Sequence, residues 1–282
     1  MPLILRQNKT TRQPLSGAVV DRNNPLTRNL VFLAMPQHNQ MVDLVGIRRG
    51  AAEFFAPPTV TQTQEGNRSF LFNGGNTANS YFNFGSADQN TADMNNGPMT
   101  MLVWMNPGTA GGGFLDRNDN NSVGAGWMFG LGVDLKPKFV KERTTSNSVG
   151  TSGTAVVAGV PTSVAVTYDG TTISGSAFTF YIGGALTATT NNTTGSNVSN
   201  TDAAQTLYLG LNRFAATGSS SARSFDGTIE LAAMWKRVLS ADEILSIHRD
   251  RYQLVKPRNQ RLFVIPAAAP GAGSRVQVFA CT

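Results

Sequence analysis

Apolar and polar residues alternate in short runs along the chain, and this pattern predicts many short β-strands. Residues 101–105 alternate, with Met101 and Met105 on one side and Trp104 on the other. A period of two residues is typical of a strand with one buried face. The same kind of run recurs at residues 68–72, 81–84, 127–131, 164–168, 178–182 and 206–214. Turns rich in Gly, Asn and Asp separate these runs, so we expect an all-β, antiparallel domain.

The most informative stretch lies between Ser224 and Arg251 and begins with a turn and a strand. Asp226-Gly227 supplies the turn, because Gly adopts positive φ without a steric penalty. The strand that follows is apolar and alternates. Its two predicted sides are Ile229, Leu231, Ala233 and Trp235, and Thr228, Glu230, Ala232 and Met234. We expect Glu230 on a solvent-facing side, because no second acid accompanies it.

A short helix is predicted directly after this strand. Ser240 and Glu243 have the spacing of a capping box, in which each side chain bonds the other residue's backbone N–H. Ile244, Leu245 and His248 fall on one helical face, which we expect to lie against the sheet. His248 is therefore expected to pack and not to act as a catalytic base.

These elements resemble a known family. The final strand and helix fit the pattern of laminin G-like (concanavalin A-like) jelly-roll domains, and most resemble the versions in structural proteins of tailed phages. The matching residues are Phe225, Gly227, Ile229, Trp235, Arg237, Leu239, Ser240, Glu243 and Ile244. Earlier segments match in order, including the Asp43–Gly46 turn, Phe72-Asn73-Gly74 and Trp104. The resemblance implies a two-sheet antiparallel jelly-roll sandwich with one short C-terminal helix and extended terminal arms.

The resemblance covers only part of the chain, and we expect three segments. Residues 1–29 form an extended basic N-terminal arm, residues 30–251 the jelly-roll domain, and residues 252–282 a C-terminal tail. The tail holds a Pro/Ala/Gly linker and an alternating run at residues 275–280. That run is predicted to be a strand, which pairs either with another subunit or with this domain's own sheet.

Charge is concentrated at the two ends of the chain. Residues 1–50 hold seven Lys or Arg against two Asp or Glu, and residues 236–282 hold eight against three. The intervening residues hold eight against twelve, so the expected sandwich is mildly acidic. Basic ends favour contact with an acidic surface, although ordinary solvated charge explains them equally well. The candidate anchoring residues are Arg6, Lys9, Arg12, Lys256, Arg258 and Arg261.

The chain lacks the residue patterns of the common enzyme classes. A glycosidase needs two carboxylates about 5–9.5 Å apart, and the five Glu do not fall into such a pattern. The two His and the single Cys281 cannot make a zinc site, and no phosphate-binding glycine motif occurs. The apolar run before Arg6 is too short for a signal peptide, and no run is long enough to span a membrane.

Two weak binding signals lie in one polar stretch. Trp127 beside Asp119, Asn120 and Asn121 is a candidate platform for a sugar ring, although burial of Trp127 in the core is the simpler interpretation. Asp116, Asn118 and Asn120 alternate as in a calcium loop, but the Gly and Glu of that motif are missing. An Asx-rich turn explains the stretch as well, so we expect no cofactor, with calcium as the alternative.

Our leading hypothesis is a non-enzymatic virion protein of a tailed phage, as the resemblance implies. It would decorate the capsid, contact the major capsid protein or other virion proteins, and form a homo-oligomer on the particle. The alternative is a carbohydrate-binding module for host-surface glycans on the tail or fibre. No membrane contact is expected, and nucleic-acid binding is not expected because the basic ends carry no interleaved aromatic residues.

Overall fold

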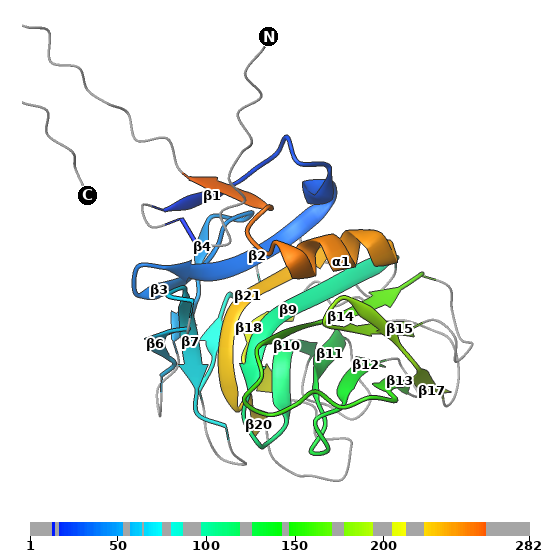
Figure 1. Cartoon of the computed structure of the whole chain (residues 1–282). Coiled ribbons are helices and arrows are strands. Elements are labelled where there is room, and N and C mark those ends of the chain that lie inside the picture. The colour runs from blue at the N-terminus through cyan, green and yellow to red at the C-terminus, as the bar shows by residue number, and fades with distance from the viewer. Residues whose placement is uncertain are drawn as a thin grey trace, which may run out of the picture.

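A computed structural model gives the fold of the chain (Figure 1). It describes residues 13–14, 17–52, 57–63, 65–74, 80–86, 97–118, 126–142, 147–170, 178–193, 205–212 and 223–257. The helices are η1 (Pro25–Thr27, a 3-10 helix) and α1 (Ala241–Arg249). The strands are β1 (Ala18–Val20), β2 (Leu30–Gln37), β3 (Gln40–Asp43), β4 (Arg48–Arg49), β5 (Ala51–Ala52), β6 (Thr59–Gln62), β7 (Arg68–Phe72), β8 (Phe82–Asn83), β9 (Met99–Pro107), β10 (Gly112–Asn118), β11 (Gly126–Leu131), β12 (Pro137–Glu142), β13 (Asn147–Ser152), β14 (Thr162–Tyr168), β15 (Phe178–Ile182), β16 (Ala185–Thr187), β17 (Thr189–Thr193), β18 (Tyr208–Leu209), β19 (Leu211–Asn212), β20 (Arg223–Ser224), β21 (Gly227–Trp235) and β22 (Val255–Pro257).

Two large sheets pack against each other as a sandwich (Figure 1). The ten-stranded sheet has the order β16-β15-β14-β9-β21-β2-β3-β4, and β7 and β6 join it beside β21. The eight-stranded sheet has the order β17-β13-β12-β11-β10-β18-β8-β5. The central pairings are antiparallel, and the one α-helix is short. The structure thus confirms the predicted all-β jelly-roll sandwich. In the described part of the chain, no helix has the length and apolar character to cross a membrane.

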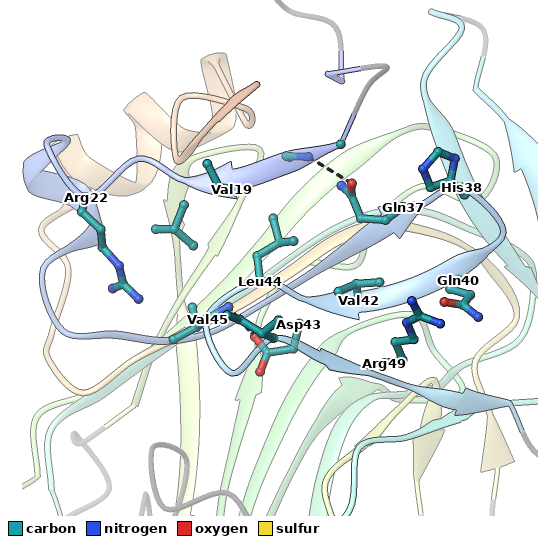
Figure 2. Close-up of a pocket in the computed structure, with 14 residues that line it drawn as sticks. Val19, Arg22, Gln37, His38, Gln40, Val42, Asp43, Leu44, Val45 and Arg49 are labelled. Atoms are coloured by element: carbon teal, nitrogen blue, oxygen red, sulfur yellow. Dashed lines mark hydrogen bonds between the residues drawn. The ribbon is translucent and has the colours of Figure 1, made fainter. Parts of the chain in front are cut away.

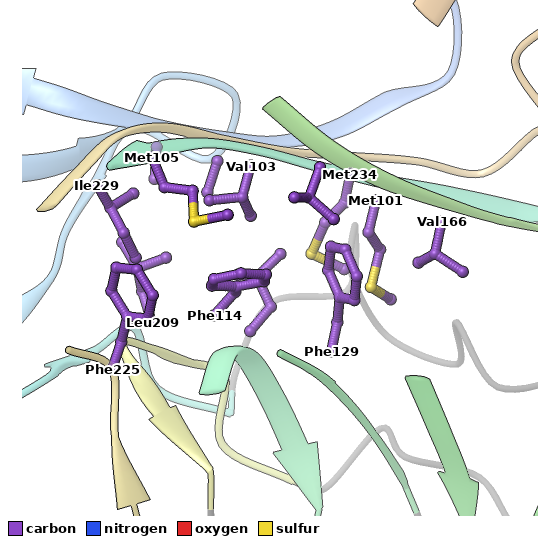
Figure 3. Close-up of a cluster of buried hydrophobic side chains, with 14 of the residues drawn as sticks. Met101, Val103, Met105, Phe114, Phe129, Val166, Leu209, Phe225, Ile229 and Met234 are labelled. Atoms are coloured by element: carbon purple, nitrogen blue, oxygen red, sulfur yellow. The ribbon is translucent and has the colours of Figure 1, made fainter. Parts of the chain in front are cut away.

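The space between the sheets is filled by apolar side chains, which we call the inner core (Figure 3). Met101, Met105 and Met234 point inward from the ten-stranded sheet, and Phe114 and Phe129 face them. Phe114 and Phe129 meet edge to face, with ring centroids 5.2 Å apart. This burial follows from the alternation, which puts every second residue of each strand on the inner face.

The predicted alternation of β21 is wrong at one point. A bulge between Ile229 and Leu231 shifts the register against β9, so Ile229 joins the inner core while Leu231 faces outward. Glu230, in the bulge, is only 3% exposed, which corrects the expectation of a solvent-facing residue. A bulge adds one residue to one strand, and period-two reasoning cannot place it.

The outer face of the ten-stranded sheet is also covered, by a second apolar cluster that we call the outer layer. Helix α1 contributes Ile244 and Ile247, both fully buried. The predicted capping box is confirmed, since Ser240 Oγ accepts from the Glu243 N–H and the Glu243 carboxylate accepts from the Ser240 N–H. The helix buries Ile247 where Leu245 was expected, and Leu245 and His248 are half-buried.

Strands β1 and β22 pair antiparallel and form a two-stranded clasp over this layer (Figure 1). Ala18 and Val20 of β1 and Val255 of β22 are buried and belong to this layer. The packed part of the chain therefore extends on both sides of the expected boundaries of residues 30–251. The outer face of the ten-stranded sheet is apolar, and β1 and β22 help to cover it. Because apolar surface is favoured inside the protein, these flanking segments pack onto the domain.

Candidate functional site

The sequence-predicted sugar platform is not at the surface. Trp127 lies on β11 with its ring in the inner core and is fully buried, which matches the simpler interpretation. A buried ring cannot stack on a sugar from solvent. Asp116 is fully buried on β10, and Asn118 ends that strand. The stretch Asp119, Asn120 and Asn121 lies outside the described residues, so the calcium loop stays a prediction.

The candidate anchoring residues fall mostly beyond the described part. Arg6, Lys9, Arg12, Arg258 and Arg261 lie outside the described residues, as does the run at residues 275–280. Lys256 is exposed on β22, and its ammonium lies 3.3 Å from the Asp21 carboxylate. Within the described ranges, no group of three or more His, Cys, Asp or Glu gathers as a metal site would require.

A buried ion pair that sequence reasoning missed holds the C-terminal segment onto the sheet. Arg251 Nε donates to Glu230 Oε1 at 2.7 Å, and the Tyr252 hydroxyl donates to the same oxygen. The Arg251 guanidinium also pairs with the exposed Glu65. Burial raises the pKa of Glu230, although Arg251 and Tyr252 oppose that shift. Burial and the Glu230 charge raise the pKa of Tyr252, so its hydroxyl stays protonated as a donor.

Trp104 sits next to this ion pair under helix α1. Its ring stacks on His248 with centroids 4.9 Å apart, and the Arg251 guanidinium lies 4.4 Å from the ring centroid. His248 Nδ1 hydrogen-bonds the Ser163 hydroxyl at 3.0 Å. Burial lowers the pKa of His248, and the charges of the neighbouring arginines lower it further. A neutral imidazole that packs on an indole confirms the packing role predicted for His248.

A small hollow, which we call the polar pocket, opens beside Glu230 and Trp104. Strands β6, β7, β9 and β21 line it, and its volume is about 150 Å³. Ser69 Oγ and Asn106 Oδ1 line the pocket, are buried, and have no hydrogen-bond partner among the described residues. Buried polar atoms without partners are rare in native structures. The polar pocket therefore offers a hydrogen-bonding ligand two unused acceptors beside an aromatic ring and a carboxylate.

The local sequence explains how this pocket is built. Gly227 has φ of +130°, and a Cβ there would lie 2.3 Å from the Asn106 carbonyl oxygen. The predicted Asp226-Gly227 turn thus lets β21 approach β9 closely enough to place Asn106 and Glu230 around one hollow. The bulge then turns Glu230 towards the outer layer, where it is buried beside the pocket. The Asp-Gly turn was visible in the sequence, but the bulge left no signal in it.

A second and larger hollow, which we call the clasp groove, lies between β1 and the strands β2, β3 and β4 (Figure 2). Its volume is about 660 Å³. Val19, Val42 and Leu44 line its middle, Arg22 lies at one end, and Arg49 lies towards the other end beside Gln40. The groove combines an apolar middle with a cation at each end. Sequence reasoning missed it because the groove forms only when the clasp closes over the sheet.

The fold has relatives among solved structures. The binding domain of Paraclostridial Mosquitocidal Protein 1 matches with a TM-score of 0.58 and 12% identity, over 81% of this chain and 53% of that one. The binding domain of botulinum neurotoxin serotype G matches with a TM-score of 0.55 and 12% identity, over 80% and 52%. The chain thus spans about half the length of these toxin binding domains. At such identities the likeness concerns the fold alone.

A shorter relative is covered almost entirely. Domain 4 of AbnA, a GH43 extracellular arabinanase from Geobacillus stearothermophilus solved in complex with arabinotriose, matches with a TM-score of 0.53 and 14% identity, over 78% of this chain and 98% of that one. No curated protein sequence matches the chain. The family model of the concanavalin A-like lectin/glucanases superfamily matches residues 73–245, which is more than half of the chain. The chain belongs to this superfamily.

Proposed function

We propose that this chain is a non-catalytic, lectin-like binding domain and that its ligand is a carbohydrate. The observation that carries the proposal is the polar pocket, where Ser69 Oγ and Asn106 Oδ1 are buried without partners. Sugar hydroxyls donate hydrogen bonds, and a site built to bond them discriminates strongly for ligands that have them. The superfamily and the arabinotriose complex of a structural relative support the same class of ligand.

The arrangement of charges in the pocket favours binding over hydrolysis. Glu230 is the one carboxylate among the described residues that line it, whereas glycoside hydrolysis uses a pair of acids. Glu65 is a second acid close to Glu230, but the Arg251 guanidinium forms an ion pair with each of these two carboxylates. The pocket therefore has acceptors for a ligand and lacks free acid–base groups for catalysis.

A glycan array tests this proposal with the full chain and two matched variants. Asn106→Leu removes the unpaired acceptor, and Asn23→Leu makes the same change at an exposed position away from the pocket. We expect the wild type and Asn23→Leu to bind the same glycans, and Asn106→Leu to bind them about tenfold more weakly or not at all. No binding by the wild type would reject the carbohydrate ligand. Equal binding by Asn106→Leu would move the site elsewhere.

We propose, second, that the chain is a structural component of a tailed-phage particle, held there by its terminal arms as a capsid decoration protein. The pairing of β1 with β22 supports this role, because it brings Ala18, near the N-terminal segment, next to Pro257, near the C-terminal segment. Two linked attachment points bind a particle with higher avidity than one does. The resemblance to phage structural proteins points the same way.

The copy number in purified particles tests this second proposal. Quantitative mass spectrometry against the major capsid protein should give hundreds of copies if the chain decorates the capsid lattice. A few dozen copies would move it to the tail or fibre, and absence would reject the virion role. A deletion of residues 1–12 keeps Gln13, whose N–H bonds Asn67 Oδ1 at 2.9 Å. We expect this variant to fold and to lose particle binding.

A further inference from the structure

We propose that the clasp groove docks an extended, acidic segment of a partner protein, with an apolar side chain in the middle and a carboxylate towards each end. This interaction is separate from carbohydrate binding in the polar pocket. The groove's volume of about 660 Å³ lies within the range of about 300–1,000 Å³ that is typical of ligand pockets.

The apolar lining of the groove includes Ile47, whose backbone conformation is strained and whose side chain is exposed to solvent. Ile47 is 87% exposed, and its φ is +53°. A β-branched residue at positive φ is a genuine outlier, and such strain collects at ligand-binding sites. His38, which also lines the groove, has a φ of +55°. Contacts within the described chain leave the Ile47 side chain exposed. A docked segment would bury it, and that burial would offset the backbone strain.

The accessible charges of the groove are positive. Arg22 and Arg49 are exposed, and neither has an ion-pair partner among the described residues. Asp43 also lines the groove, but it is fully buried and accepts from the backbone N–H groups of Leu33, Val45 and Gly46. A partner therefore meets two arginines with no exposed acid between them, which favours carboxylates.

This charge pattern also decides between possible occupants. The chain's own arms carry Arg6, Lys9 and Arg12 on one side and Arg258, Arg261 and Arg275 on the other. Like charges would meet if either arm lay in the groove, and like-charge juxtaposition is costly. An acidic segment from another protein fits the groove, and the chain's own basic arms do not.

One buried donor indicates that the occupant brings hydrogen-bond acceptors. Gln37 Oε1 accepts from the Ala18 N–H at 3.0 Å (Figure 2). Its Nε2 is buried at the groove and has no partner among the described residues. A backbone carbonyl of an extended peptide supplies such an acceptor at every residue. The amide therefore suits a peptide better than a purely apolar ligand.

The first test measures peptide affinity by fluorescence polarisation. The probe is a labelled peptide of alternating glutamate and valine, and its counterpart has glutamine in place of glutamate. Arg49→Glu and Lys136→Glu change the net charge equally, but Lys136 lies in the turn before β12 on the other sheet. We expect Arg49→Glu to weaken binding of the glutamate peptide about tenfold and Lys136→Glu to leave it unchanged. Equal effects, or no binding by the wild type, would overturn the proposal.

The second test uses Ile47→Gly, which removes the strain together with the apolar contact. We expect peptide binding to weaken several-fold while Tm rises by roughly 2–4 °C. A merely structural Ile47 would not give opposite changes in stability and binding. Sedimentation of the wild type alone tests whether a second copy of this chain occupies the groove. A dimer that Arg49→Glu dissociates would show that it does and would overturn the peptide proposal.

Discussion

The ten-stranded sheet is covered on both faces, and the two layers differ in kind. The inner core consists mainly of apolar side chains from two sheets that face each other, and the buried Lys141 joins it by donating to the Tyr168 hydroxyl at 3.2 Å. The outer layer is assembled from α1, the clasp and the segment around Tyr252. It includes the Glu230–Arg251 ion pair and the Trp104–His248 stack, and both hollows lie at its borders.

The difference shows where this fold leaves room for function. Among the described residues, the apolar side chains of two facing sheets fill the space between them, and such interiors are close-packed. A helix and a clasp cover a broad sheet incompletely, and polar groups remain at the borders of what they cover. The predictions below test this contrast, in order of decreasing effect on stability.

Trp127→Ala should have the largest effect, because it removes the largest side chain of the inner core. We expect it to lower the free energy of unfolding by about 3–5 kcal/mol, measured by urea denaturation. Glycan binding by the remaining folded protein should be unchanged. A loss below about 1 kcal/mol together with lost glycan binding would contradict the assignment of Trp127 to the core and restore it as a sugar platform.

Arg251→Met should be the most damaging substitution in the outer layer. It leaves the Glu230 carboxylate buried without its ion-pair partner, which costs about 3 kcal/mol. Adding Glu230→Leu should recover much of that loss, because two apolar residues leave no buried charge. A double-mutant cycle from urea unfolding measures the coupling. Additive losses in the double variant would show that the two charges do not depend on each other.

Ser240→Ala should cost about 1 kcal/mol, which is typical of a lost N-cap. The substitution removes the acceptor for the Glu243 N–H and loosens the first turn of α1. Thermal unfolding measures the loss, and Ser240→Asp, which can still cap, serves as the control. If both variants lost the same stability, the cap would not be what fixes the helix.

The smallest predicted effect is a difference in pH dependence between two glutamates. The hydrogen bond from Arg237 lowers the pKa of Glu243, so its stabilisation is present above the ordinary carboxyl range and is lost as the pH falls. Burial raises the pKa of Glu230, so its contribution is present at acid pH and is lost as the pH rises through that raised value.

Urea unfolding of Glu243→Gln and Glu230→Gln from about pH 3 to about pH 7 compares these two contributions. The advantage of the wild type over Glu243→Gln should grow with pH, by about 0.2–1 kcal/mol. Its advantage over Glu230→Gln should shrink with pH. Parallel trends in the two variants would contradict the opposite environments of these carboxylates.

The sequence predicted the sandwich and its helix because both depend on local patterns. Alternation placed Met101 and Met105 on one side of their strand and Trp104 on the other, and the Ser240–Glu243 spacing located the start of α1. The polar pocket depends instead on a bulge that turns Glu230 outward and on Arg251, which reaches it from beyond the helix. Neither leaves a periodic signal. The clasp groove likewise depends on a pairing between β1 and β22, which lie at opposite ends of the described chain.

The central claim, that a carbohydrate binds in the polar pocket, is tested most directly by the indole signals of the three tryptophans in a ¹⁵N-labelled sample. Trp104 lines the pocket, whereas Trp127 and Trp235 are fully buried elsewhere and act as internal controls. The protein is titrated with arabinotriose and with the glycans retained on the array. We predict that the Trp104 signal shifts in a saturable way while the other two stay in place. A bound glycan that leaves Trp104 unmoved would contradict the account.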